Sequence, residues 1–208
     1  MDKKVSDEII HTESTNNKVT KPSREEAMEA VKTLISWAGD DPSREGLIET
    51  PKRVVKAFEE YFAGYSKSPK NILEKTFFET GNYQEFVMLQ NIEFRSHCEH
   101  HLAPIIGYAS VAYIPDGKVV GISKLARIVD VFAKRLQTQE TMTSQIANSI
   151  QNNLNPKGVA VFISAEHHCM SSRGVMKAHV DMSTTFFTGD FIESQNLQNR
   201  FLHSLTSK

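Results

Sequence analysis

Apolar side chains recur at helical spacing in two segments near the N-terminus. The first begins at Ser23, which opens a capping box, and its apolar residues follow every three or four positions. The second begins at Thr50 and Pro51, an N-cap followed by proline at the first helical position. We therefore expect a helical part over residues 23–65, and we expect the polar residues 1–22 before it to form a flexible tail.

Beyond residue 65 the pattern alternates between strands and helices. Apolar alternation and turn residues predict strands over residues 86–94, 105–114, 119–122, 159–163 and 175–187. Helical periodicity predicts a helix capped by Ser123, a second one around 142–154 and a short closing helix over 191–205. Helices before, between and after antiparallel strand pairs indicate an α+β fold, with helices on one face of an antiparallel sheet. We treat residues 23–208 as one domain, whose α+β part spans 66–208.

Composition narrows the class of protein. The chain has 208 residues, 39% of them hydrophobic and 24% charged, with a net charge of −1, as in ordinary globular proteins. Without a basic excess we expect no nucleic acid and no membrane surface as a partner. No apolar run approaches the roughly 20 residues of a membrane span, and the N-terminus does not resemble a signal peptide, so we expect a cytoplasmic protein. Two cysteines in that reducing compartment suit metal binding or catalysis better than a disulfide.

Histidines gather around both cysteines. Five of the eight lie within three residues of Cys98 or Cys169, in the runs His97–His101 and His167–Cys169. Thiolate and imidazole are zinc ligands, and a catalytic zinc site has three protein ligands with a fourth position open for water. Two cysteines and one histidine would leave that position open, and the surplus histidines could transfer protons. A closed structural zinc site with a second histidine, or a set of ordinary half-buried histidines, are the alternatives.

Two predicted helices begin with cations, which oppose the helix dipole. The cationic residues in these first turns are Lys52, Arg53 and Lys56 in one helix, and Lys124 and Arg127 in the other. Free amides and a positive dipole end, with added Lys and Arg, suit a phosphate group. Arg173, four residues after Cys169, could add a guanidinium near the metal. The pattern favours a polyphosphate ligand over a solvated cationic surface. There is no Walker-type glycine loop, so ordinary phosphoryl transfer is poorly supported.

Several motifs together resemble the GTP cyclohydrolase I family. They follow one another in unbroken order over roughly residues 24–191 and include Thr50–Arg53, Ser96–Leu102, Ala112–Pro115, Gly121–Val129, Arg135–Glu140, His167–Met170 and Arg173–Val175. The resemblance implies a zinc enzyme that hydrolyses the imidazole ring of GTP, releases formate and forms 7,8-dihydroneopterin triphosphate, the first step of pterin and tetrahydrofolate biosynthesis.

The resemblance also implies roles for individual residues. It gives Cys98, His101 and Cys169 as zinc ligands and His100 and His167 as proton-transfer residues. It gives Gln139 and Glu140 as the pair that recognises guanine. The implied triphosphate contacts are Ser123, Lys124, Arg127 and Arg173, together with Arg53 and Lys56.

The family's fold is the two-layer tunnelling fold, assembled as a toroidal homodecamer with active sites between subunits. The resemblance therefore implies that Arg53 and Lys56 serve a neighbouring subunit. The family commonly has small hydroxyl residues around Val180 and Met182, whereas here Ser183, Thr184 and Thr185 follow. A zinc-stabilised, nucleotide-binding assembly module and a tunnelling-fold enzyme for another pterin or purine are the competing interpretations.

Overall fold

The computed structural model describes residues 21–78, 81 and 83–206. The chain divides into two compact units within one helix, between Lys56 and Ala57, and each unit is described by itself. Apart from Lys21 and Pro22, the predicted tail lies outside the described residues. The division of residues 23–208 into domains stays a prediction.

The N-terminal unit contains helix α1 (Arg24–Trp37) and the start of α2 (Thr50–Tyr61). The predicted capping box is present: Ser23 accepts a hydrogen bond from the Glu26 N–H, and the Glu26 carboxylate accepts one from the Ser23 N–H. Thr50 was expected as the N-cap of α2 but is already its first helical residue.

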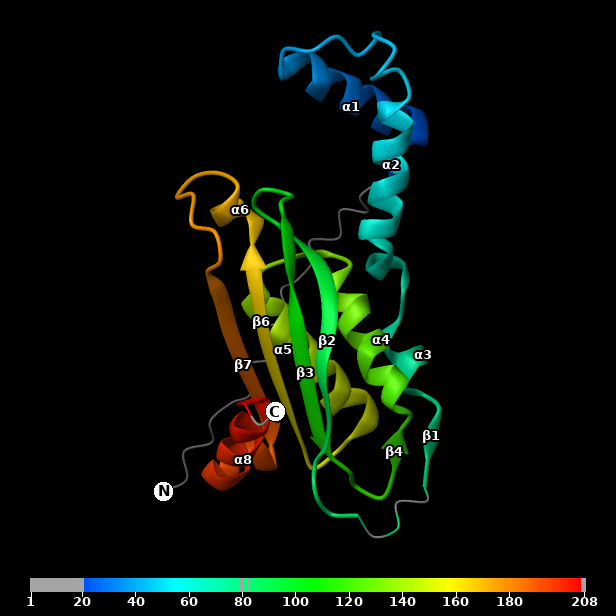
Figure 1. Ribbon diagram of the computed structural model, residues 1–208. Helices are drawn as coiled ribbons and strands as arrows, with labels where there is room; N and C mark the ends of the chain where they lie inside the picture. Colours follow the sequence, from blue (N-terminus) through cyan, green and yellow to red (C-terminus); the bar gives the residue numbers. More distant parts are fainter. Residues whose placement is uncertain (1–20, 79–80, 82, 207–208) are drawn as a thin grey trace, which may run out of the picture. The chain divides into compact units, whose positions relative to one another are not determined.

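The second unit holds the sheet (Figure 1). After α2 its elements are a 3-10 helix (Ala63–Ser66), α3 (Pro69–Leu73), β1 (Thr76–Phe77), β2 (Val87–Cys98), β3 (Pro104–Ile114), β4 (Val119–Val120), α4 (Ile122–Ala133), β5 (Leu136–Gln137), α5 (Gln139–Leu154), β6 (Gly158–His167), α6 (His168–Ser171), β7 (Asp181–Gly189), α7 (Asp190–Glu193) and α8 (Gln195–Thr206). The main sheet has the order β5-β2-β3-β6-β7; its pairs are antiparallel except β5 with β2. The predicted α+β class is confirmed.

Four local expectations in the second unit were wrong. The short strand expected over residues 119–122 is present but ends at Val120, and it pairs with β1 in a separate two-stranded sheet. Helix α4 follows Gly121 as its N-cap, so Ser123 lies within its first turn and does not cap it. Strand β7 begins at Asp181, not at residue 175, because residues 172–180 form a connection that includes the left-handed Gly174. The closing helix is interrupted at Ser194, whose backbone is extended.

Helices were expected on one face of the sheet only, but they cover both faces, unequally. Helices α4 and α5 cover one face (Figure 1). They form the larger core there, which includes Val111 and Tyr113 of β3. On the other face, α7 and α8 pack through Phe191 and Phe201 against Ala112 and other residues of the strands. The alternation of side chains along a strand explains why neighbours such as Val111 and Ala112 enter different cores.

Strand register brings three strand ends to one edge of the sheet. His97, next to the end of β2, pairs with Pro104 at the start of β3. The next residue of β3, Ile105, pairs with His167 at the end of β6. The two cysteine–histidine motifs, some 70 residues apart in sequence, therefore meet at this edge. Among the described residues, no helix has the length and apolar character needed to cross a bilayer.

Candidate metal centre and active site

The turn between β2 and β3 presents the first two metal-ligand candidates. The Cys98 N–H donates to the Ala103 carbonyl (2.8 Å) and the Leu102 N–H donates to the Cys98 carbonyl (2.9 Å). Leu102 takes up a left-handed backbone conformation that closes the turn. A third bond, from the Glu99 N–H to the Gln137 carbonyl (3.1 Å), attaches the turn to β5. The backbone thereby fixes His101 above the buried Cys98.

The third candidate comes from the end of β6. Cys169 lies in the one-turn helix α6, which directly continues that strand. The Ser172 N–H and hydroxyl both donate to the His168 carbonyl, at 3.0 and 2.6 Å, and close this turn. Cys169 is half-buried and packs against the main core.

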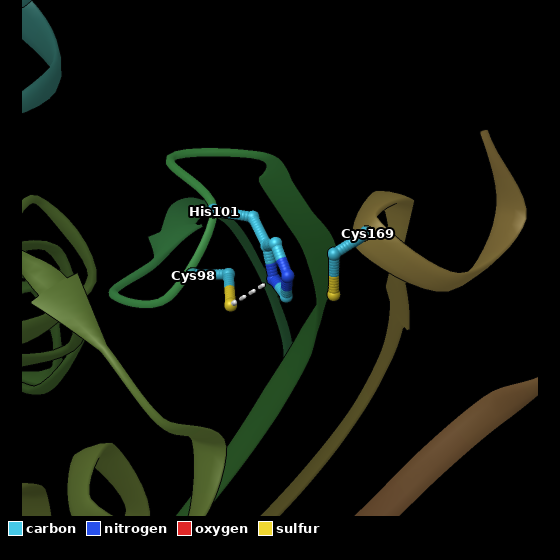
Figure 2. Close-up of side chains that lie close together, drawn as sticks. All are labelled: Cys98, His101 and Cys169. Atoms are coloured by element: carbon cyan, nitrogen blue, oxygen red, sulfur yellow. Dashed lines mark hydrogen bonds between the residues drawn. The ribbon is translucent and has the colours of Figure 1, made fainter. Parts of the chain in front are cut away.

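The three side chains converge on a common point. Figure 2 shows Cys98 and Cys169 on either side of the His101 ring, with the two sulfur atoms directed toward the same space. Their potential ligand atoms all lie within 4.8 Å of one another, and Cys98 Sγ is 3.9 Å from His101 Nδ1. Usual zinc–sulfur and zinc–nitrogen bonds at tetrahedral angles require about 3.6 Å between such atoms. The donor set fits zinc, and the spacing of Cys98 and His101 is close to this requirement.

No second histidine joins this cluster in the described part of the chain. The described residues therefore provide three potential protein ligands, the arrangement expected for catalysis. His100 lies beside the cluster, with its Nδ1 3.8 Å from Cys98 Sγ.

Burial and the Cys98 thiol raise the pKa of Cys169, and Arg173 opposes this shift. Arg173 also donates a hydrogen bond to His101 Nε2 (3.1 Å), which places its guanidinium at the rim of the cluster. A metal must displace the thiol protons before it binds here, as at any thiolate site.

The neighbouring histidines have distinct surroundings. His100 is exposed, and its Nε2 lies 3.6 Å from the Glu99 carboxylate. His167 is half-buried, and its Nε2 lies 2.8 Å from Gln139 Oε1; burial lowers the pKa of His167, and Glu140 opposes this shift. His97 packs against the rings of Tyr61 and Phe62, and burial lowers its pKa, so it suits a neutral packing role.

Gln139 and Glu140, which begin α5, differ in exposure. Gln139 is completely buried, whereas Glu140 is exposed. The side-chain amide of Gln139 forms all its hydrogen bonds with protein groups. In this conformation it therefore does not contact a bound ligand. Only Glu140 of this pair is open to a substrate.

The predicted phosphate-binding residues are held by fewer contacts than the metal-ligand candidates. Ser123 and Arg127 are exposed and Lys124 is half-buried on the first turns of α4, and none of the three side chains has an ion pair or hydrogen bond to another described residue. Arg127 lines a hollow of about 500 Å³ with Lys67 and Ser68. Arg53 and Lys56 are exposed on α2 but belong to the N-terminal unit, so the structure does not place them relative to the metal cluster.

A comparison with known proteins identifies the family of the chain. The sequence profile of GTP cyclohydrolase I matches residues 27–206. The chain belongs to the GTP cyclohydrolase I family. Two relatives are "GTP cyclohydrolase 1" of Maricaulis maris (strain MCS10), 59% identical over 89% of this chain and 91% of its own, and "GTP cyclohydrolase 1" of Hyphomonas neptunium (strain ATCC 15444), 60% identical over 89% and 90%. The apo crystal structure of the archaeosine synthase QueF-Like is 20% identical, with a TM-score of 0.44, and covers 52% of this chain and 97% of that one.

Within this GTP cyclohydrolase I framework, sequence reasoning missed the residues that hold the site in place. Arg135 donates to the Gly64 carbonyl (3.1 Å) and lies over the Phe132 ring (4.8 Å), which fixes the approach to β5. A Cβ at Gly64 would come within 2.1 Å of the Val131 carbonyl oxygen, so only glycine fits there. Thr143 and Thr184 bond to Gln139 or to one another. The one available signal was Thr143, a hydroxyl residue one helical turn after Gln139 in an apolar stripe.

Proposed function

We propose that this chain hydrolyses the imidazole ring of GTP, releasing formate and yielding 7,8-dihydroneopterin triphosphate, at the sheet edge where Cys98, His101 and Cys169 converge. The observation that carries the proposal is this three-ligand cluster with two histidines beside it, in a chain of the GTP cyclohydrolase I family. Zinc bound there would supply a Lewis acid that makes water available as hydroxide near neutral pH.

The chain's own residues would handle protons and recognise the base. His100 and His167 flank the ligands from the two strand ends, so each can exchange a proton with a purine held at the cluster. The exposed Glu140 carboxylate can accept hydrogen bonds from N1–H and the amino group of guanine. Adenine lacks that pair of donors, so Glu140 would select guanine.

The triphosphate would meet the cationic side chains. Arg173 already lies at the metal cluster through its bond to His101. Ser123, Lys124 and Arg127 present a hydroxyl and two cations at the start of α4, where the helix dipole also favours an anion. Arg53 and Lys56 would join from α2, and we assign them to the site of a neighbouring subunit.

We further propose a homo-oligomer, specifically a toroidal decamer. Two strand edges of the main sheet support this. Strand β7 ends the sheet order, and β2 is covered by β5 only at His97 and Cys98. Such open edges suit pairing with another copy. Native mass spectrometry should show a mass ten times that of the 23.4 kDa chain; a monomer would contradict the proposal.

Purified, zinc-loaded protein incubated with GTP should yield formate and, after oxidation, a fluorescent pterin. His100→Ala should retain one zinc per chain and lose turnover by roughly 10²- to 10⁴-fold, because a proton-transfer group is gone and the ligands remain. His203→Ala, a histidine on α8 at the opposite end of the sheet, is the matched control.

The same experiment separates the competing functions. A nucleotide-binding assembly module would form no formate and would respond equally to both histidine substitutions. An enzyme for another pterin or purine would be inactive on GTP and active on another member of a substrate panel.

A further inference from the structure

The Gln139 side chain makes polar contacts with four other groups of the protein. It is the first residue of α5 and is completely buried. Its side-chain nitrogen lies 2.8 Å from the Met182 carbonyl, 3.2 Å from the Ile163 carbonyl and 3.1 Å from the Thr184 hydroxyl. Its side-chain oxygen lies 2.8 Å from His167 Nε2.

The orientation of the Gln139 amide follows from these neighbours. Carbonyl oxygens only accept hydrogen bonds, so the group that faces Met182 and Ile163 must be the NH₂. Turning the amide over would oppose its oxygen to two carbonyl oxygens in a buried place, which leaves polar groups unsatisfied at a cost of about 1–3 kcal/mol each.

The threonine hydroxyls agree with this orientation. Thr143 donates to the Gln139 backbone carbonyl at 2.6 Å, so its only proton is used. Thr184, 2.7 Å from Thr143, must therefore be the donor between the two hydroxyls. With its proton so engaged, Thr184 can only accept from the Gln139 amide. Each hydroxyl proton therefore has one acceptor, and the two amide protons of Gln139 are shared among three acceptors.

The orientation of the Gln139 amide determines which ring nitrogen of His167 carries the proton. Because Gln139 presents an oxygen, the His167 nitrogen that faces it must carry the proton and donate it. In the neutral ring a protonated Nε2 leaves Nδ1 as the unprotonated nitrogen, free to accept a proton.

We propose that Gln139 is a positioning residue that holds His167 in the Nε2–H tautomer, so that Nδ1 exchanges protons with the substrate, and that guanine is recognised by Glu140 without the Gln139 side chain. This differs from the pairwise guanine contact that the family resemblance implies. Its kinetic consequences rest on the proposed function, whereas its structural claim does not.

The tautomer can be tested directly on the full-length, zinc-loaded protein. Histidine labelled with ¹⁵N should give a magic-angle-spinning spectrum in which His167, assigned by its disappearance in His167→Gln, has a protonated Nε2 and a bare Nδ1 in the neutral ring. A protonated Nδ1 with a bare Nε2 would overturn the proposal. This readout needs no catalytic activity, so it remains decisive even if GTP proves not to be the substrate.

Kinetics distinguish positioning from substrate contact. Gln139→Leu should lower kcat for GTP by roughly 10- to 100-fold, the size usual for a residue that orients a reacting group, with KM changed less than about threefold. A raised KM with unchanged kcat would identify Gln139 as a guanine contact and overturn the proposal.

A matched substitution controls for damage to α5. Gln151 lies on the same helix, donates to the Pro156 carbonyl (2.9 Å) and accepts from Thr188 (2.7 Å), at the end away from His167. Gln151→Leu should destabilise the protein comparably and leave kcat unchanged. Thr184→Val should lower kcat less than Gln139→Leu does, and Thr184→Ser, which keeps the hydroxyl, should restore it. Equal losses of kcat in Gln139→Leu and Gln151→Leu would reduce Gln139 to a structural role.

Discussion

The metal-binding edge of the sheet and the start of α4 differ in how firmly contacts within the chain hold their side chains. At the edge, Cys98, His101 and His167 are held by backbone turns, burial and specific hydrogen bonds. At the start of α4, Lys124 and Arg127 extend from the first turns without a described partner. Under the proposed function, the groups that take part in bond breaking need a fixed geometry, whereas point charges that bind a flexible triphosphate do not. The contrast predicts that substitutions at the two places fail in different ways.

The largest effect should come from removing a ligand. Cys169→Ala should reduce bound zinc from one per chain to nearly none and lower GTP hydrolysis by roughly 10³-fold or more, because two remaining ligands hold the ion poorly and no activated water is available. Elemental analysis and formate release measure the two quantities. Full zinc occupancy in this variant would show that the cluster is not the metal site.

A smaller loss is expected at the exposed carboxylate. Glu140→Gln should keep its zinc and lower kcat/KM for GTP by about 10- to 100-fold, since hydrogen bonds to a charged group contribute about 1.5–3 kcal/mol. Steady-state kinetics with GTP and ITP, which lacks the amino group, should show the preference for GTP shrinking. An unchanged preference would place base recognition elsewhere.

The smallest effect should appear at α4. Lys124→Ala and Arg127→Ala should each raise KM for GTP by about tenfold, with kcat and zinc content nearly unchanged, and should weaken the dependence of KM on salt. Lys157→Ala, an exposed lysine just before β6 at the opposite end of the sheet, is the matched control. A fall in kcat without a change in KM would mean that these cations act on the chemical step, and the contrast between the two regions would fail.

Much of the fold could be predicted because the spacing of apolar residues along the sequence reflects which side chains are buried. Strands β2, β3 and β6 and helix α5 carry strong alternating or helical patterns and fell close to their expected places. The errors fell where tertiary contacts override local preference: β4 is a two-residue strand that exists only through pairing with β1. The start of β7 was misplaced because Val175 and Val180 are apolar but exposed, in a connection that follows the metal site.

At the site, the sequence predicted which residues take part but not how their side chains are oriented. Cysteine and histidine spacing predicted that the two motifs meet at a metal site, since few other uses account for both in one chain, and the family resemblance singled out His101 among the neighbouring histidines. Spacing could not reveal that Gln139 points inward while its neighbour Glu140 points outward, because adjacent residues of a helix face directions about 100° apart and only packing selects between them. The threonines that orient Gln139 lie 4 and 45 positions away, and of the two only Thr143, a hydroxyl residue in an apolar stripe, carries a sequence signal.

The shared strand register has a practical consequence for engineering. All three ligands depend on where β2 and β6 stop, and a strand slipped by one residue turns every side chain to the opposite face. The turn at Gly117 lies after the far end of β3, where glycine has a left-handed backbone and open space around it. A fluorescent reporter or an affinity handle inserted there would leave the spacing of the zinc ligands untouched, whereas one extra residue between Cys98 and Pro104 would dismantle it.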